Sequence, residues 1–367
     1  MKKAVAFLVC LLFPCLMGSA LSQTLSVTGK VTKIEKFGHA RLDITIEDFL
    51  DAGFAFGDLV TVKTGSFEED MPFFNGYYAE SGESMIRGYP GQKNIALCIN
   101  YGHFADTSGV SVGDAVTLAL KEKAGALAVQ QAFNLVYTND RADYDSDEIF
   151  ANFRSVRAGR IGEGKLYRSA SPVNHAYGRN IIANRLIREA GIRSVMNMAD
   201  TDEGILKYPT YEDFDSAYYM DLVRNGHVIA LGMPIDFSSD AFAQGMVRGL
   251  TFLAGQEPPY LVHCTESKDR AGLCLMLLEA LMGASEEEIT EDYLASYINY
   301  YHLDPDRDAP LLEVIAQRNV LRMLRTLAGT GENGDLADAD LSRAAENYLL
   351  SHGMEEKAMR TLMEKLQ

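Results

Sequence analysis

The stretch LVHCTESKDRAGL, residues 261–273, decides how the second half of the chain folds. The apolar run 260–262 predicts a strand, and the apolar run 273–282 predicts a helix. Cys264 follows the strand directly, and Arg270 comes six positions later, in the arrangement Cys-x5-Arg. Such a loop can turn its backbone N–H groups toward one anion, and the helix N-terminus adds partial positive charge. We expect Cys264 to lie at the bottom of this anion-binding nest.

Cys264 and Arg270 together suit chemistry at phosphorus. An electropositive nest favours the thiolate of a cysteine, which is its nucleophilic form. The planar guanidinium of Arg270 can hold two phosphoryl oxygens at once, which a lysine cannot do. A phosphocysteine intermediate also needs a proton donor for the leaving oxygen and then an activated water. We therefore expect no cofactor and no metal, and the histidines outside this loop show no metal-ligand spacing.

The segments around this loop alternate between helical and strand patterns. NIIANRLIREAG, residues 180–191, has helical periodicity and leads into the apolar run 192–198, and a second helical stretch covers 241–253. Ser285 and Glu288 form a capping box that opens another helix. This alternation predicts an α/β domain with a mostly parallel central sheet flanked by helices, which binds ligands at the carboxyl ends of its strands.

The first third of the chain has a different pattern. From 25 to 120 the apolar residues often alternate, as in Leu42, Ile44 and Ile46, with glycines between the runs. Period-two patterning predicts strands, and we expect a small all-β, barrel-like domain. The expected organisation is a signal peptide over 1–22, the barrel-like domain over 23–123, an acidic connector over 124–148 and the α/β domain over 149–367.

Residues 1–20 have the features of a secretory signal. Two lysines precede a charge-free run over 4–17, and small residues follow around Ala20. The run is too short to span a bilayer. Lipidation at Cys15 is the alternative, but a Phe-Pro pair directly before that cysteine disfavours it. We expect an exported protein, either periplasmic or secreted.

Charge and composition exclude two classes of partner. The chain has 34 Lys and Arg against 51 Asp and Glu, a formal charge of −17, whereas nucleic-acid binding needs clustered cations. No later apolar run reaches the roughly 18 residues of a membrane helix, so we expect no integral membrane segment. Cys98, Cys264 and Cys274 remain after the signal, and their odd number leaves at least one free thiol.

HCTESKDRAG, residues 263–272, resembles the HCxxGKDRTG loop of a bacterial tyrosine- and lipid-phosphatase family in the cysteine-dependent protein tyrosine phosphatase superfamily. Further segments resemble that family's motifs in the same order: NFR at 152–154, GKLYRSASP at 164–172, GIRSVMNMADTDE at 191–203 and AAENYLLSHGM at 344–354. The resemblance implies a phosphatase fold, with Cys264 as the nucleophile and Arg270 as the phosphate-binding residue.

The resemblance also implies roles for neighbouring residues. In that family the loop aspartate is the proposed general acid, which places this role on Asp269. A rival is Asp236, in MPIDFSSD after a predicted strand, where other members of the superfamily carry the acid on a movable loop. We expect Lys268 to add charge at the pocket mouth and His263 to orient the loop by hydrogen bonding rather than act as a base. The other residues of the expected phosphate-binding loop are Thr265, Glu266, Ser267, Ala271 and Gly272.

Three residues depart from the family pattern, and a fourth residue of the loop, Glu266, affects its charge. Ala271 replaces a hydroxyl residue that helps the thiolate leave, so we expect slow turnover of the intermediate. Ser267 replaces a glycine, and a positive φ there would carry strain. Ala199 stands where the family often has an arginine. Glu266 adds negative charge beside the expected phosphate and disfavours very highly charged lipids or inositol phosphates.

The barrel-like domain has a resemblance of its own. KIEKFGHARLDI at 33–44 and ALCINYGHFADTSGVSVGDAVTLAL at 96–120 are similar to the C-terminal β-barrel of SAM hydroxide adenosyltransferases. The similarity covers this domain alone, implies no catalytic role and leaves the partner of the domain unknown.

Two classes of function remain open. The first is an exported phosphatase that hydrolyses phosphomonoesters through a phosphocysteine, with a phosphotyrosine protein, a phosphoinositide or a soluble inositol phosphate as substrate. The alternative is a catalytically weak phosphoryl-group binding protein, a pseudophosphatase that acts as an interaction module. Ala271, Ser267 and the additional domain motivate this alternative.

Some side chains keep two interpretations. Arg168 suits either a ligand contact or a structural ion pair, and Cys274 suits either the buried core or a resolving thiol for Cys264. Four tyrosines fall partly on one helical face and are expected to pack rather than bind: Tyr293, Tyr297, Tyr300 and Tyr301.

Overall fold

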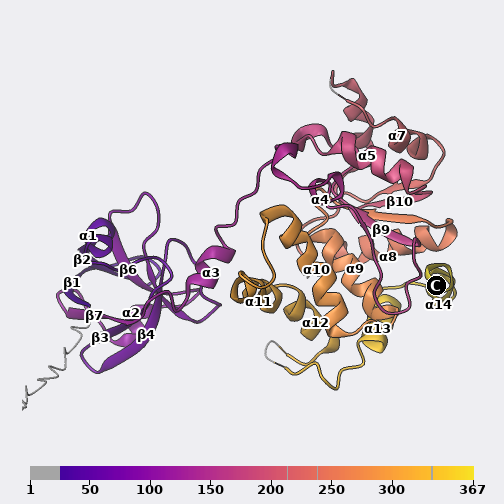
Figure 1. Cartoon of the computed structure of the whole chain (residues 1–367). Helices are drawn as coiled ribbons and strands as arrows, with labels where there is room; N and C mark the ends of the chain where they lie inside the picture. The colour runs from indigo at the N-terminus through magenta and orange to yellow at the C-terminus, as the bar shows by residue number, and fades with distance from the viewer. Residues whose placement is uncertain (1–24, 213, 238, 332–333) are drawn as a thin grey trace, which may run out of the picture. The chain divides into compact units, whose positions relative to one another are not determined.

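The computed structural model describes residues 25–212, 214–237, 239–331 and 334–367 (Figure 1). The chain divides into two compact units between Gln130 and Gln131, inside helix α3 (Leu127–Ala132). This division falls within 124–148, the segment expected to connect two domains. The expected signal peptide, residues 1–22, lies outside the described residues.

The first unit is a closed barrel in the part of the chain that the structure describes. Its strands follow the order β1-β2-β6-β5-β4-β3-β7, and β7 pairs back with β1. The strands are β1 (Ser26–Ile34), β2 (Ala40–Thr45), β3 (Leu59–Thr64), β4 (Phe67–Phe74), β5 (Ser84–Arg87), β6 (Asn94–Ile99) and β7 (Ala115–Glu122). Neighbours are antiparallel apart from β4 and β5, which run parallel. A barrel-like domain is thus confirmed.

Two short helices, which the prediction of an all-β domain did not include, lie in connections between the strands of the barrel. They are α1 (Ile46–Asp51) and α2 (Phe104–Ser108). Ile46, expected to continue the alternating pattern, instead begins α1. The side chain of Thr45 caps this helix, since its Oγ1 accepts a hydrogen bond from the N–H of Asp48 at 2.9 Å. The capping residue therefore outweighed the period-two pattern.

The second unit contains a five-stranded sheet among its described residues, in the order β11-β10-β12-β9-β8. The strands are β8 (Arg154–Ser155), β9 (Leu166–Ser169), β10 (Ser194–Asn197), β11 (Val228–Ala230) and β12 (Tyr260–His263). All neighbours run parallel except β8 and β9. The mostly parallel sheet is confirmed, and β12 occupies its centre.

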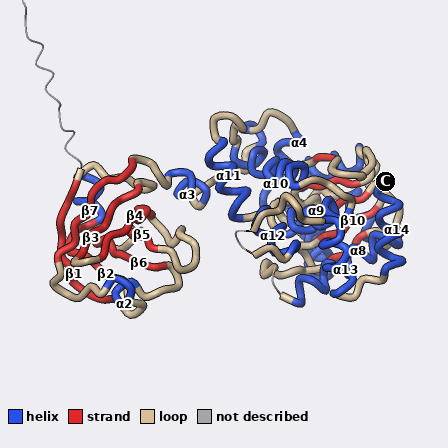
Figure 2. Tube along the Cα trace, turned by 90° about the horizontal axis from the view of Figure 1, so that it is seen from below, coloured by secondary structure: helices blue, strands red, loops and turns tan. Residues whose placement is uncertain are grey.

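Helices cover both faces of this sheet (Figures 1 and 2). Their bounds are α4 (Asp147–Phe150), α5 (Asn180–Glu189), α6 (Asp202–Lys207), α7 (Ala217–Arg224), α8 (Asp240–Gly255), α9 (Arg270–Leu281), α10 (Glu286–Tyr301), α11 (Ala309–Arg318), α12 (Val320–Ala328), α13 (Leu341–Ser351) and α14 (Glu356–Leu366). Short 3₁₀ turns cover Arg141–Asp143, His175–Tyr177 and Tyr208–Thr210. Met196 and Val262 pack into a core with α8 to α14, whereas Val195 and Leu261 pack with α5 to α7. Successive strand residues thus serve opposite faces.

Helix α9 lies inside the larger of these two cores. Nearly all its residues from Ala271 to Leu281 are buried, and its neighbours are β12, α10, α12 and α13. A helix that is apolar on every side is expected to be buried in this way. The strand, the loop and the helix of the Cys-x5-Arg segment therefore run through the middle of the unit.

Several local predictions are confirmed. The helical pattern of 180–191 forms α5, and that of 241–253 forms α8. The capping box opens α10, with the N–H of Ser285 donating to Glu288 Oε2 at 2.8 Å and the N–H of Glu288 donating to Ser285 Oγ at 3.2 Å. Within the described ranges, no helix is both long and apolar enough to cross a membrane.

Candidate active site

The loop 264–269 leaves the carboxyl end of the central strand. β12 is paired with β10 on one side and β9 on the other, so Cys264 emerges at the middle of the sheet edge where parallel sheets bind ligands. Arg270 begins α9 directly after the loop. Cys264 is 3% exposed, which places its thiol at the base of the loop.

Carbonyl groups around this loop point outward. Four successive carbonyls, those of residues 264–267, accept hydrogen bonds from outside the loop. The donors are His263 Nδ1 to the carbonyl of Cys264, the Ser171 N–H to that of Thr265 and Asn152 Nδ2 to that of Glu266, each at 3.0 Å. The carbonyl of Ser267 accepts from Ser296 Oγ at 3.3 Å and from Arg168. A peptide's N–H points opposite to its C=O, so the amides turn inward. Among the described residues, none accepts a hydrogen bond from the amides of 265–269. This is the geometry of an anion-binding nest.

Ser267, which replaces a glycine of the family loop, has a positive φ. Its φ is 60°, and it is fully buried. A non-glycine residue in this region costs roughly 1–2 kcal/mol. Its Oγ accepts from Arg168 Nε at 3.2 Å, and its carbonyl accepts from Arg168 and Ser296, so surrounding contacts hold the strained conformation.

Arg168 is a structural residue beneath the loop. It is 0% exposed and forms an ion pair with Asp292, which also pairs with Arg154 at 2.9 Å. Burial disfavours the Asp292 carboxylate, but the two guanidinium groups overcome this and hold the pKa of Asp292 well below its ordinary value. Of the two interpretations of Arg168, the structure supports the ion pair.

Arg270 lies with its guanidinium over the loop. Nη2 donates to Thr265 Oγ1 at 3.2 Å, and Nη1 donates to the carbonyl of Met233 at 3.2 Å. Met233 belongs to the connection between β11 and α8, which also carries Asp236. These two contacts orient the fork that would receive two phosphoryl oxygens.

The two candidate acids occupy different environments. Asp269 is half-buried at the start of α9, and burial together with the Glu266 charge raises its pKa against the opposing effects of Lys268 and Arg270. A carboxyl that keeps its proton to higher pH suits proton donation. Asp236 is exposed on the connection that reaches Arg270 through Met233. The favoured acid therefore lies at the end of the loop, and its rival lies three residues after the Met233 contact of Arg270.

Glu266 is engaged by neighbouring side chains. Its Oε1 accepts from the Tyr137 hydroxyl at 2.6 Å, and its Oε2 forms an ion pair with Lys268 Nζ at 3.1 Å. Lys268 Nζ also donates to the Tyr301 hydroxyl at 3.0 Å. Burial alone would lower the pKa of Lys268, but Asp269 and Glu266 raise it. The expected repulsion of a bound phosphate by Glu266 is therefore partly offset.

Tyr137 belongs to the strap, which we define as residues 133–146 between α3 and α4. Its ring packs edge-on against Tyr300 and Tyr301. Arg179, 3% exposed, fixes the strap by donating to the carbonyl of Thr138 at 2.8 Å and the hydroxyl of Tyr144 at 2.9 Å. The strap thus joins the phosphate loop through the tyrosines of α10.

His263 orients the loop. Because a carbonyl only accepts, Nδ1 carries the proton in its contact with the Cys264 carbonyl. Nε2 then accepts from the Tyr219 hydroxyl at 3.1 Å. Burial lowers the pKa of His263 to about 4, so the ring is neutral near pH 7. The described contacts fit the orienting role and give no role as a base.

Ala271 and Gly272 pack below the loop. Ala271 is 0% exposed in the apolar core and brings no hydroxyl to the thiol. A Cβ on Gly272 would lie 2.8 Å from the Tyr293 ring, so a larger residue does not fit there without displacement. Cys274 is buried and unpaired, and burial raises its pKa to about 12. A core role fits Cys274 better than that of a resolving thiol.

Sequence reasoning missed several supporting residues. Asp292 pairs with Arg154 and Arg168. Ser296 accepts a hydrogen bond from Arg154 and donates one to the Ser267 carbonyl. Asn299 donates to Asn152 at 3.0 Å. A signal was present, because these polar residues follow i, i+4, i+7 spacing beside the tyrosine stripe of α10. Tyr137 gave no such signal, since nothing local in the strap predicts its contact with Glu266.

The mostly parallel sheet, with the Cys264 loop at the carboxyl end of its central strand, is an α/β domain with an anion-binding loop. Residues 150–367 match the family model described as "Tyrosine phosphatase family", which covers more than half of the chain. The chain belongs to this family, and membership supports phosphatase activity.

Solved structures give weaker similarities. An uncharacterized conserved protein from Thermotoga maritima matches with 22% identity and a TM-score of 0.24, covering 25% of this chain and 35% of that chain. The core catalytic domain of the PP-IP phosphatase SIW14 from S. cerevisiae, in complex with citrate, matches with 18% identity and a TM-score of 0.26, covering 46% of this chain and 91% of that chain. No curated protein matches.

Proposed function

We propose that this protein hydrolyses phosphomonoesters through a phosphocysteine intermediate on Cys264. One observation carries the proposal: four successive loop carbonyls are bound from outside, so the amides face the space above the thiol. Arg270 lies over the same space, held by Thr265 and Met233. Nest and guanidinium together supply donors for the oxygens of one phosphoryl group.

The proposed reaction has two steps. The Cys264 thiolate attacks phosphorus, the bond to the leaving oxygen breaks, and Asp269 donates its proton to that oxygen. Water then attacks the phosphocysteine while the Asp269 carboxylate accepts a proton, and Cys264 leaves as thiolate. Arg270 and the loop amides hold the charge on the equatorial oxygens throughout. Without a hydroxyl at Ala271, the second step is the slower one.

The subclass belongs to the same proposal. We place the protein in the bacterial tyrosine- and lipid-phosphatase type, with phosphotyrosine protein, phosphoinositide or inositol phosphate as candidate substrates.

We also propose that the barrel is related to that of SAM hydroxide adenosyltransferases and binds an unidentified partner. We further propose that the protein is exported through a signal at 1–22. Cell fractionation with sequencing of the mature N-terminus tests export, and an uncleaved cytoplasmic protein would contradict it.

The alternative function is phosphoryl-group binding with little turnover. It is favoured by the buried Ala271 and by the strained Ser267, the two departures within residues 263–272. A burst of product followed by a stable phosphocysteine would support this alternative. Steady turnover over many cycles would exclude it.

The deciding experiment is steady-state phosphate release with chelator and reductant present. Phosphotyrosine peptide, phosphoinositide and inositol hexakisphosphate are compared in parallel. Cys264→Ser should abolish turnover, because it replaces the nucleophile with a hydroxyl that the nest does not ionise. Cys274→Ser is the matched control, since this buried thiol lies outside the loop, and it should retain turnover. Undiminished activity of Cys264→Ser would refute the proposal.

A further inference from the structure

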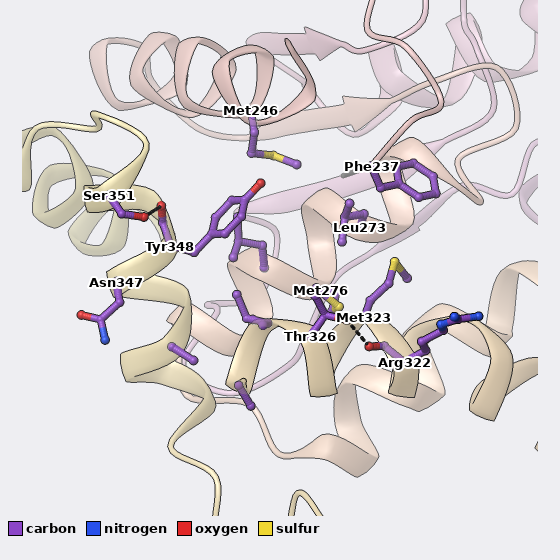
Figure 3. A pocket seen from close by; sticks show the side chains of 14 residues that line it. Phe237, Met246, Leu273, Met276, Arg322, Met323, Thr326, Asn347, Tyr348 and Ser351 are labelled. Atoms are coloured by element: carbon purple, nitrogen blue, oxygen red, sulfur yellow. Dashed lines mark hydrogen bonds between the residues drawn. The ribbon is translucent and has the colours of Figure 1, made fainter. Parts of the chain in front are cut away.

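The second unit contains an apolar pocket outside the loop (Figure 3). It has a volume of about 570 Å³ and lies among α8, α9, α12 and α13, with Phe237 at one end. This volume falls within the ~300–1,000 Å³ of ordinary small-molecule sites. Met246, Met276 and Met323 point into it, and flexible methionines adapt to ligands of variable shape.

Two residues of the pocket wall, Leu273 and Phe237, come from the segments that carry Arg270 and its Met233 partner. Leu273 follows Arg270 by three residues, about 4.5 Å along the axis of α9. Phe237, in the same wall, directly follows Asp236. Arg270 also binds the carbonyl of Met233, four residues before Phe237. A molecule whose phosphate lies at Arg270 can therefore extend into the pocket without a long spacer.

The lining has an unusual charge for this chain. The chain carries 51 acidic residues, yet none is among the 14 described residues that line the pocket. Arg322 is the charged residue of this set. An apolar wall without carboxylates suits a hydrocarbon that is attached to an anion.

We propose that this pocket holds the hydrocarbon chain of a phosphomonoester whose phosphate is joined directly to a long-chain alcohol. The inference rests on the proposed function, because the phosphate must occupy the Cys264 loop. A phosphotyrosyl ring would leave the pocket empty. An inositol ring between the phosphate and the lipid would move the hydrocarbon chain away from Leu273 by the width of the ring.

Chain-length kinetics test this occupant. Monoalkyl phosphates from ethyl to octyl are compared, each below its micelle-forming concentration, with para-nitrophenyl phosphate as a chain-free reference. The kcat/KM should rise by up to about fourfold for each added methylene, the factor that complete burial of a methylene gives. Calorimetric binding of the same series to Cys264→Ser should show the same trend without turnover.

Variants locate the effect. Ala344 and Thr326 line the pocket from α13 and α12, and Ala344→Phe or Thr326→Phe would fill it. Either change should lower the ratio of kcat/KM for octyl phosphate to kcat/KM for ethyl phosphate, and the corresponding ratio of binding constants, toward one. Arg343→Phe adds the same ring at the adjacent exposed position and should keep the wild-type ratio. Since Thr326 is exposed, its variant remains informative if Ala344→Phe does not fold.

The outcomes separate the two proposals. If the protein hydrolyses para-nitrophenyl phosphate but its kcat/KM for alkyl phosphates does not depend on chain length, the pocket assignment is overturned and the proposed function remains intact. Chain-length-dependent binding without any turnover supports the pocket and refutes the phosphatase. A preference for phosphoinositide vesicles over all alkyl phosphates, or a trend that survives both filling variants, also overturns the assignment.

Discussion

Residues beside the thiol set the rate of each proposed step. Ala271 occupies the position where a hydroxyl would stabilise the departing thiolate, and it is fully buried. Cys264 therefore lacks one hydrogen bond in the second step. In the proposed mechanism the loop amides and Arg270 act on the phosphoryl oxygens rather than on sulfur, so they do not replace this hydrogen bond.

Ala271→Ser should speed hydrolysis of the intermediate. The added hydroxyl supplies one hydrogen bond to sulfur, worth about 1 kcal/mol, which corresponds to roughly a fivefold rise in kcat. Rapid-quench measurement of burst and steady state checks this, and the burst should shrink relative to turnover. An unchanged ratio of the two phases would show that release of the thiolate is not limiting.

Asp269→Asn tests the proton donor through pH. Asp269 must be protonated to donate in the first step, which kcat/KM reports, and burial raises its pKa, so kcat/KM on poor leaving groups should stay high to a higher pH than an ordinary aspartate allows and then fall. Asp269→Asn should remove this descending limb and lower kcat/KM by about 10²-fold or more on alkyl phosphates. Asp236→Asn is the matched comparison, and loss of the limb in that variant instead would move the role to Asp236.

At the scale of elements, α10 supports the loop from below. Its Asp292 is the shared partner of Arg154 and Arg168, and its Ser296 donates to the Ser267 carbonyl. The same helix presents Tyr301 to Lys268. The loop therefore depends on a helix that follows it in the chain.

Asp292→Asn should destabilise the fold strongly. Removing one charge leaves the buried Arg168 and the half-buried Arg154 without their ionised partner, which costs about 3 kcal/mol or more. Urea unfolding measures this, with the exposed Glu291→Gln on the same helix as control. Because the pKa of Asp292 is depressed, wild-type stability from this group is present above the ordinary aspartate pKa and declines as pH falls below it. Equal stability of the two variants would contradict the network.

Local signals explain which elements the sequence could predict. The Cys264 to Arg270 spacing, the flanking strand and helix, and the Ser285 capping box are encoded within a few residues, and each is found in the structure. The prediction that Ile46 continues a strand was wrong, because the side chain of Thr45 caps a helix that begins there. The partners of the loop carbonyls come from distant segments, Asn152, Ser171 and Ser296, and tertiary packing alone brings them together.

At the scale of the whole molecule, the strap belongs to the second unit although it precedes the family match at 150–367. A chain beginning at Gln131 keeps the strap, whereas one beginning at Asp145 loses Tyr137 and Tyr144. The shorter chain removes the Thr138 and Tyr144 partners of Arg179 and should be less stable by about 3 kcal/mol, because each hydrogen bond to a charged group contributes roughly 1.5 kcal/mol or more. Thermal and urea unfolding of both chains check this, and equal stability would show that the strap does not support the unit.

The burial of α9 has a consequence for the influence of salt. The partial charges at its N-terminus act over a few ångströms inside the protein, where mobile ions do not enter, while the net charge of −17 repels an approaching anion over longer distances. Salt at 0.15 M screens interactions beyond about 8 Å. Added salt should therefore weaken the long-range repulsion by the net charge more than the binding of the anion at the N-terminus of α9. The kcat/KM for a small phosphate dianion should then increase with ionic strength.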